Sequence, residues 1–156
     1  MSRLAIPVIG QVLYATGDVT LRASVTLALK DDAGGFANWT FRIDSATDLT
    51  TFPAFNARQL GLPMPVHPSR IRHDPTGLEV RSGLLRFRID GMDATEYAVS
   101  CFFLGNLAVL PNPALPAFLP RALLQPLALL DHLKFTMEKH PASIGASQGE
   151  VIIEKR

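Results

Sequence analysis

Short segments in which apolar and polar residues alternate recur along this chain, and no other feature of the sequence constrains the fold as strongly. An alternation of period two places every second side chain on one face of a β-strand. The pattern is clear in residues 25–29, 39–43 and 85–90. Residues 30–35, which are rich in Asp and Gly, separate the first two segments and predict a hairpin. The sequence therefore predicts a mostly β fold.

Two later segments predict further strands. Residues 97–104 form a continuous apolar run with aromatic side chains, which is typical of a strand covered on both faces. Residues 150–154 predict a short closing strand. Between these segments, residues 110–120 contain too many prolines for regular structure, and we expect a surface loop there.

Two segments predict short helices. Pro53 suits the first position of a helix that runs to Leu60, and Gly61 supplies its stop. Pro126 is suited to open the second helix. Its apolar residues recur at helical spacing and a lysine stands near its end: Leu127, Leu130, Leu133 and Lys134.

Length and composition bound the class of protein. The 156 residues are about one domain long, so we expect a single domain over residues 1–156. The formal charge is only +1, which gives no reason to expect a nucleic-acid partner. No apolar run approaches the roughly 20 residues that span a bilayer. The single cysteine, Cys101, lies in an apolar run, which favours a reducing compartment and a cytoplasmic location.

The segment with the most chemical content is residues 39–53. An apolar strand runs directly into residues 44–48, which read Asp-Ser-Ala-Thr-Asp, and a second short strand and a helix ending in Leu-Gly-Leu at 60–62 follow. This order resembles the retropepsin-like aspartic proteases, whose sequences run strand, Asp-Thr/Ser-Gly-Ala-Asp, strand, helix ending in Leu-Gly-Leu. An Asp-Ser pair after a strand is also ordinary loop chemistry, because both side chains bond local backbone amides.

The resemblance continues over most of the chain. Residues 74–77 fall where the family has the tip of its flap hairpin, and residues 83–89 are similar to its returning strand. Residues 123–125 resemble the family's apolar-apolar-Gly segment beneath the catalytic loop, residues 129–135 its C-terminal helix, and residues 150–156 its terminal strand. The resemblance implies a single-lobe acid-protease (retropepsin-like) closed β-barrel with one or two short helices. It also implies a homodimer in which terminal strands, near residues 4–9 and 151–153, pair across the interface.

Peptide hydrolysis by this class needs two carboxylates close enough to share one proton. This chain offers one such loop, because neither Asp93-Ala94-Thr95 nor Asp31-Asp32-Ala33 follows an apolar strand. A second chain must then supply the other carboxylate to act on a peptide or protein substrate. The resemblance implies no metal and no organic cofactor. It assigns Asp44 and Ser45 as catalytic, and Ala46, Asp48, Asp74, Pro75, Thr76 and Gly77 as substrate-binding.

Two positions depart from the family pattern. Ala46 and Gln125 stand where the family has glycines, and the family's following arginine is absent. We expect the added bulk at both positions to separate the paired carboxylates. Two hypotheses follow: an aspartic endopeptidase acting as a homodimer, or a catalytically degenerate retropepsin-like fold serving as a peptide-binding or structural dimer module.

Other polar clusters carry weaker signals. The histidines at 67, 73, 132 and 140 have no metal-ligand spacing, so we expect no metal site. Positive charge gathers around the strands of the predicted flap, which is consistent with acidic peptides or with a solvated strand face. The residues are Arg70, Arg72, His73, Arg81, Arg86 and Arg88.

Overall fold

The computed structural model describes residues 2–12, 16–17, 19–65, 67–108, 121–139 and 147–156, and most of them lie in β-strands. The predicted mostly β fold is confirmed, whereas the predicted loop at 110–120 lies outside the described residues. The strands are β1 (Arg3–Val12), β2 (Val19–Arg22), β3 (Ser24–Lys30), β4 (Phe36–Ile43), β5 (Thr50–Pro53), β6 (Ile71–His73), β7 (Glu79–Ile89), β8 (Tyr97–Leu104), β9 (Leu123–Leu124), β10 (Leu133–Lys139) and β11 (Ser147–Lys155). Within these described ranges the helices are α1 (Ala54–Gln59) and the 3-10 helices η1 (Pro68–Arg70) and η3 (Pro126–Leu129).

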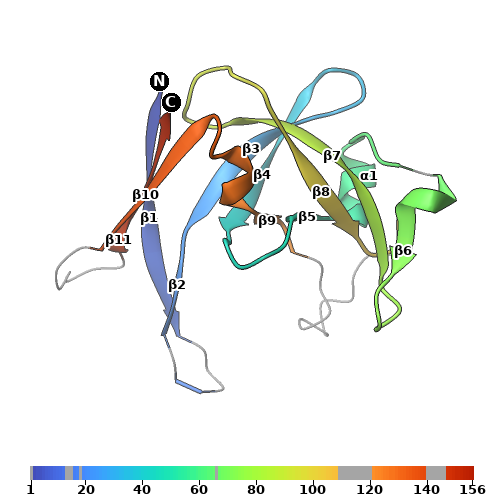
Figure 1. Ribbon diagram of the computed structural model, residues 1–156, viewed down its shortest axis with the longest axis horizontal. Helices are drawn as coiled ribbons and strands as arrows, with labels where there is room; N and C mark the ends of the chain where they lie inside the picture. Colours follow the sequence, from blue (N-terminus) through green and yellow to red (C-terminus); the bar gives the residue numbers. More distant parts are fainter. Residues whose placement is uncertain (1, 13–15, 18, 66, 109–120, 140–146) are drawn as a thin grey trace.

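Six strands close into a barrel in the order β3-β4-β9-β5-β8-β7, and β7 pairs with β3 to complete the ring. The closing pairs run antiparallel from Leu27↔Ile89 to Leu29↔Phe87. The two-residue strand β9 is inserted between β4 and β5, parallel to the first and antiparallel to the second. β6 lies outside the ring and pairs with the outer end of β7 (Figure 1). The barrel thus brings residues 123–124 next to both strands that flank residues 44–49.

The barrel interior is filled by the alternating side chains that the sequence pattern marks as apolar. In β3 the buried residues are Val25, Leu27 and Leu29, and the residues between them are partly exposed. Four phenylalanines with no exposed surface fill much of the remaining volume. They are Phe41, Phe52, Phe87 and Phe103. Burial of such rings supplies much of the free energy that favours the folded chain.

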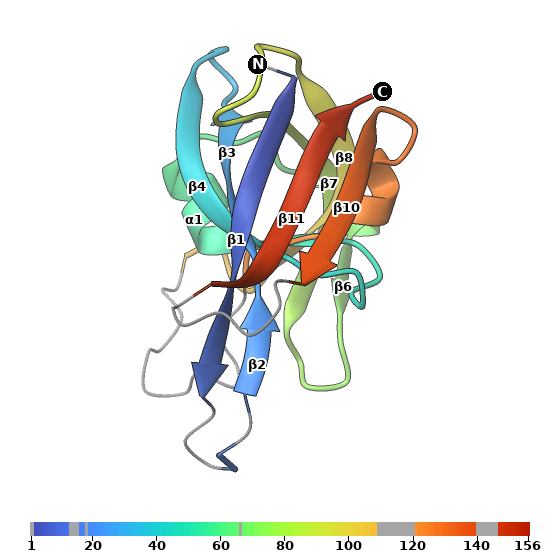
Figure 2. The same cartoon turned by 90° about the vertical axis from the view of Figure 1, so that its left-hand side faces the viewer.

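The two ends of the chain form a second, four-stranded sheet in the order β10-β11-β1-β2. Figure 2 shows β11 lying between β1 and β10. The expectation that the terminal strands pair across a dimer interface is wrong, because β1 and β11 pair with each other within the chain, from Arg3↔Glu154 to Pro7↔Glu150. β10 occupies the other edge of β11. Both edges of the C-terminal strand are therefore already paired.

The first predicted helix is confirmed and the second is wrong. α1 follows Pro53, and Gly61 has a left-handed backbone (φ +69°) that ends it. The second segment forms only the 3-10 turn η3, and Leu133 begins β10 instead of ending a helix. From Leu133 onward the chain alternates again, and this period of two decides the structure.

The strand expected to be covered on both faces has one face open. In β8, Tyr97, Val99, Cys101 and Phe103 are buried, while the residues between them are exposed or half-buried. Within the described residues, no helix has the length and apolar character needed to cross a membrane.

Candidate functional site

Residues 44–49 form a loop whose base is held by backbone hydrogen bonds. The loop leaves β4 at Ile43 and enters β5 at Thr50. The N–H of Ile43 donates to the carbonyl of Ala23 (2.9 Å), and the N–H of Asp44 donates to the carbonyl of Leu124 in β9 (2.9 Å). Asp44 is therefore fixed at the point where the inserted strand meets the end of β4.

Both oxygens of the Asp44 carboxylate have donors within the chain. Oδ1 accepts a hydrogen bond from the backbone N–H of Ala46 (3.0 Å). Oδ2 lies 3.4 Å from Nη2 of Arg42, and each of these two side chains is 25% exposed. Arg42 is a site residue that was not predicted from the sequence. The Arg-Ile-Asp run carries the signal, because residues two apart on a strand share a face.

Gln125 clamps the loop from beneath. Its Nε2 donates to the carbonyl oxygens of Ser45 (3.2 Å) and Thr47, and its Oε1 accepts from the N–H of Leu127 (3.0 Å). The backbone N–H of Gln125 donates to Oγ1 of the buried Thr50 (3.1 Å). The side chain is thus a buried polar group whose donors and acceptor are satisfied by backbone. Gln125 therefore holds the loop to β9 through hydrogen bonds. The expectation from the sequence considered only the size of its side chain.

The remaining predicted residues of the loop face solvent. Ser45, Ala46 and Asp48 are exposed. Thr47 turns its hydroxyl back onto the carbonyl of Leu49 (2.9 Å). Within the described part of the chain, the side chains of Ser45 and Asp48 have no hydrogen-bond partner, so both are open to a ligand or a second chain.

The predicted hairpin at 74–77 is confirmed as β6, a tight turn and β7. Asp74 builds the turn, because its Oδ1 accepts from the N–H of Thr76 (2.8 Å), the hydroxyl of Thr76 (2.6 Å) and the N–H of Leu78 (3.0 Å). These bonds, led by the Thr76 hydroxyl, lower the pKa of Asp74. Gly77 supplies the left-handed backbone (φ +84°).

The structure brings the loop and the hairpin tip to the same end of the barrel, which is the lower end in Figure 1. Asp74 is committed to its own turn, whereas Pro75, Thr76 and Gly77 are exposed at the tip. No hydrogen bond joins the tip to residues 44–49 in the described ranges. Contact of either segment with a substrate stays a prediction.

No group of three or more His, Cys, Asp or Glu side chains in the described portion of the chain could hold a metal ion. Three of the four histidines are described, and all three are exposed. The fourth, His140, lies outside the described residues.

Comparison with known proteins identifies no similar protein for this chain. No protein-family model, no curated protein and no solved structure gives a significant match to the chain. The candidate site is therefore argued from the geometry of residues 44–49 and their contacts.

Proposed function

We propose that this chain is one subunit of a retropepsin-like aspartic endopeptidase that acts as a homodimer, with Asp44 of each chain forming the catalytic pair. One observation carries the proposal: the Asp-Ser-Ala-Thr-Asp loop leaves a strand of a closed barrel and is held from beneath by the inserted residues 123–125. That is the position in which the family resemblance puts its apolar-apolar-Gly segment.

The chemistry follows from two carboxylates that share one proton. The ionised carboxyl takes a proton from a water molecule, whose oxygen attacks the peptide carbonyl carbon. The protonated carboxyl donates to the carbonyl oxygen, which gives a tetrahedral diol. Collapse of the diol breaks the C–N bond. One diol hydroxyl returns its proton to the second carboxyl as the new C=O forms, and the amine leaves with the proton held by the first carboxyl.

An apolar surface beside the clamp supports association of two chains. Leu127 is 59% exposed and Leu130 is 36% exposed, and the N–H of Leu127 bonds directly to the side chain that holds the loop. The two leucines stand three residues apart in one turn of chain, and contiguous exposed apolar surface is typical of an interface with a partner. A two-fold axis near this point would bring the two loops together.

The second candidate function is a dimeric peptide-binding module that has lost hydrolysis, and the Arg42–Asp44 contact favours it. Nη2 of Arg42 lies 3.4 Å from Oδ2, and the N–H of Ala46 donates to Oδ1, so both oxygens of the carboxylate already have donors within the chain. While Arg42 contacts Oδ2, that oxygen is not free to share a proton with Asp44 of a second chain. The endopeptidase proposal therefore requires Arg42 to leave Asp44 when the dimer or a substrate binds.

The test is a peptide-library cleavage assay over a range of pH, in which wild type is compared with Asp44→Asn. The endopeptidase proposal predicts cleavage that Asp44→Asn abolishes and that Asp90→Asn, a matched change at an exposed aspartate after β7, leaves intact. Sedimentation of both proteins establishes whether a dimer is present. A monomer at micromolar concentration would contradict both candidate functions.

The Arg42→Met variant separates the two candidate functions. If wild type is inactive and Arg42→Met cleaves peptides through Asp44, the ion pair is what holds the site inactive. If both proteins are folded dimers without activity, the binding-module function stands instead.

A further inference from the structure

The terminal sheet ends in an open strand edge. Its strand order is β10-β11-β1-β2, and within the described residues β10 pairs with β11 alone. Figure 2 shows β10 beside β11 at the edge of this sheet. β10 contains no proline, and its seven residues keep one register against β11, from Leu133↔Lys155 to Lys139↔Gly149. A regular, unblocked edge of this length is a template for another strand.

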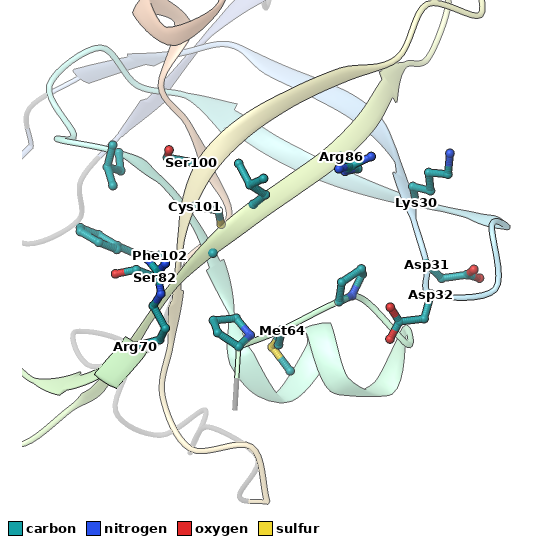
Figure 3. A pocket seen from close by; sticks show the side chains of 15 residues that line it. Lys30, Asp31, Asp32, Met64, Arg70, Ser82, Arg86, Ser100, Cys101 and Phe102 are labelled. Carbon is teal, nitrogen blue, oxygen red and sulfur yellow. The ribbon is translucent and has the colours of Figure 1, made fainter. Parts of the chain in front are cut away.

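Other strands with an unpaired edge at the end of a sheet offer less. β2 has four residues and β6 has three. The edge of β7 that β6 and β3 share is also interrupted, since β6 pairs as far as residue 81 and β3 pairs from residue 87. Only Leu84 is open between these pairings, and it lies in the groove that Figure 3 shows. That edge is therefore too short to take a strand, whereas the edge of β10 is not.

Hydrogen bonds at the end of β11 show which groups of β10 face the open edge. The N–H of Arg156 donates to the carbonyl of His132 (3.0 Å), and the N–H of Lys155 donates to the carbonyl of Ser2 (2.9 Å). Even-numbered residues of β11 therefore bond toward β10, and odd-numbered residues bond toward β1. Because β10 keeps one register against β11, its even-numbered residues point their N–H and C=O groups to β11. The N–H and C=O groups of residues 133, 135, 137 and 139 point to the open edge.

The sequence of β10 is complementary to itself in one register. Two antiparallel copies related by a two-fold axis at Thr136 place Lys134 of each copy opposite Glu138 of the other. Phe135 then lies opposite Met137, and both residues direct their hydrogen-bonding groups to the edge. The neighbouring registers that keep these hydrogen bonds move the axis to Phe135 or Met137, and both lose the two charge pairs. Opposite charges and facing threonines stabilise antiparallel strands.

The side chains of β10 fit such a partner. Met137 is 66% exposed. Glu138 is exposed and stands opposite Glu150 of β11, a like-charge pair that a lysine from a second copy would relieve. The side chain of Lys134 is 63% exposed and lies 3.9 Å from Glu154. Both members of each charge pair are therefore accessible from the open edge.

We propose that two copies of this chain pair through β10, antiparallel about a two-fold axis at Thr136, so that the terminal sheets join into one sheet with four strands from each copy. The proposal rests on the proposed function for the existence of a homodimer, and it needs no catalytic activity. η3, which carries the exposed Leu127 and Leu130, leads directly into β10. The apolar surface and the open edge thus belong to one stretch of chain, residues 126–139.

The first experiment is a disulfide cross-link at the axis. In the proposed register the two Thr136 residues form a non-hydrogen-bonded pair, whose Cα atoms lie about 4.5 Å apart, a separation that a disulfide spans. Thr136→Cys should give a covalent dimer on mild oxidation, measured by non-reducing electrophoresis. The native Cys101 is buried, so wild type should give none. Thr40→Cys, at an exposed threonine of β4, is the matched control and should not cross-link.

The second experiment removes a hydrogen bond of the edge. Proline has no N–H, and the N–H of Met137 points to the partner, so Met137→Pro removes bonds between the copies and keeps the bonds of β10 to β11. Sedimentation of the full chain should show dimerisation weakened at least about ten-fold. Met137→Ala shortens the same side chain and keeps the N–H, so this control should weaken dimerisation less. Circular dichroism checks that both variants fold.

The third experiment tests the register. Glu138→Lys places a lysine opposite Lys134 of the other copy and should weaken dimerisation about ten-fold. Within the chain the same change places the lysine opposite Glu150, so the monomer should fold. Mixing this variant with Lys134→Glu should restore dimers, because each mixed dimer again contains two pairs of opposite charge.

The outcomes separate this interface from the homodimer itself. A wild-type dimer that Met137→Pro leaves intact, and that Thr136→Cys does not cross-link, would overturn pairing through β10 while the proposed homodimer stands. Variants that dissociate as expected from a dimer without peptidase activity would support the interface and count against the endopeptidase. A wild-type monomer at micromolar concentration would overturn the interface and the homodimer together.

Discussion

Phe52 lies at the centre of the aromatic cluster beneath the candidate site. It has no exposed surface, stacks on Phe41 at 5.5 Å and meets the ring of Trp39 edge-on at 5.2 Å. Phe52→Ala would leave a cavity among rings that other strands hold in place, so we expect it to lower the free energy of unfolding by about 3–5 kcal/mol. Urea unfolding followed by circular dichroism measures the change. Leu84→Ala, at a residue 54% exposed, should stay within about 0.5 kcal/mol, and an equally small loss for Phe52→Ala would contradict the packing described.

Individual residues were predictable where local chemistry decides their structure. The turn at 74–77 and the end of α1 at Gly61 were both predicted. Each depends on a glycine with a left-handed backbone, Gly77 and Gly61, which few other residues adopt. The roles of Arg42 and Gln125 were not predicted. Arg42 follows from strand alternation, whereas the clamp by Gln125 joins residues about 80 positions apart. No local pattern encodes such a contact.

β9 has only two residues, so the contact between this segment and the loop depends on the side chain of Gln125 as well as on backbone pairing. Gln125→Ala removes both bonds to the carbonyls of Ser45 and Thr47, so we expect a loss of about 1–3 kcal/mol in the free energy of unfolding and faster amide exchange in residues 44–49. Gln59→Ala is the matched control, since Gln59 is exposed and, among the described residues, its side chain bonds to that of Asn56 alone. Unchanged stability and exchange would show that Gln125 does not hold the loop. Gln125→Gly would likewise cost these bonds as well as remove bulk.

Elements were predictable where one period dominates a segment. The strands predicted at 25–29, 39–43 and 85–90 alternate cleanly and correspond to β3, β4 and β7, although β7 ends at Ile89. Residues 126–134 contain leucines whose spacing fits a helix, yet Leu127 and Leu130 are exposed while Leu129 and Leu133 are buried. The face predicted from the helical spacing is therefore not the face that is buried. Tertiary packing outweighs the helical pattern in this segment.

At the scale of the whole molecule, strand partners could not be read from the sequence. The pairing of β1 with β11 joins the two ends of the chain, and the insertion of β9 joins positions far apart in sequence. Such pairings are selected by the total apolar surface buried and by register, which depend on every strand at once. The alternation establishes which face of each strand is buried, but it does not determine which other strand pairs with it.

A single cluster ties the terminal sheet to the barrel and predicts how the molecule responds to acid. Lys155 of β11 donates to Asp93 (3.1 Å) and to the hydroxyl of Thr95 (2.8 Å) in the segment between β7 and β8. The Thr95 hydroxyl, followed by Lys155, lowers the pKa of Asp93 from 3.8 to about 2.

Because the pKa of Asp93 is lower in the folded chain, its stabilising contribution is complete above the unfolded value near 3.8 and is lost as the pH falls toward 2. We therefore expect Asp93→Asn to lower the free energy of unfolding by a constant amount above about pH 5, and expect the difference from wild type to vanish toward about pH 2. Urea unfolding of both proteins between these pH values measures it. Asp90→Asn is the matched control, because Asp90 is exposed and its carboxylate has no partner among the described residues. A difference between Asp93→Asn and wild type that grows as the pH falls would contradict the assignment, since it would require the folded chain to favour the protonated form of Asp93.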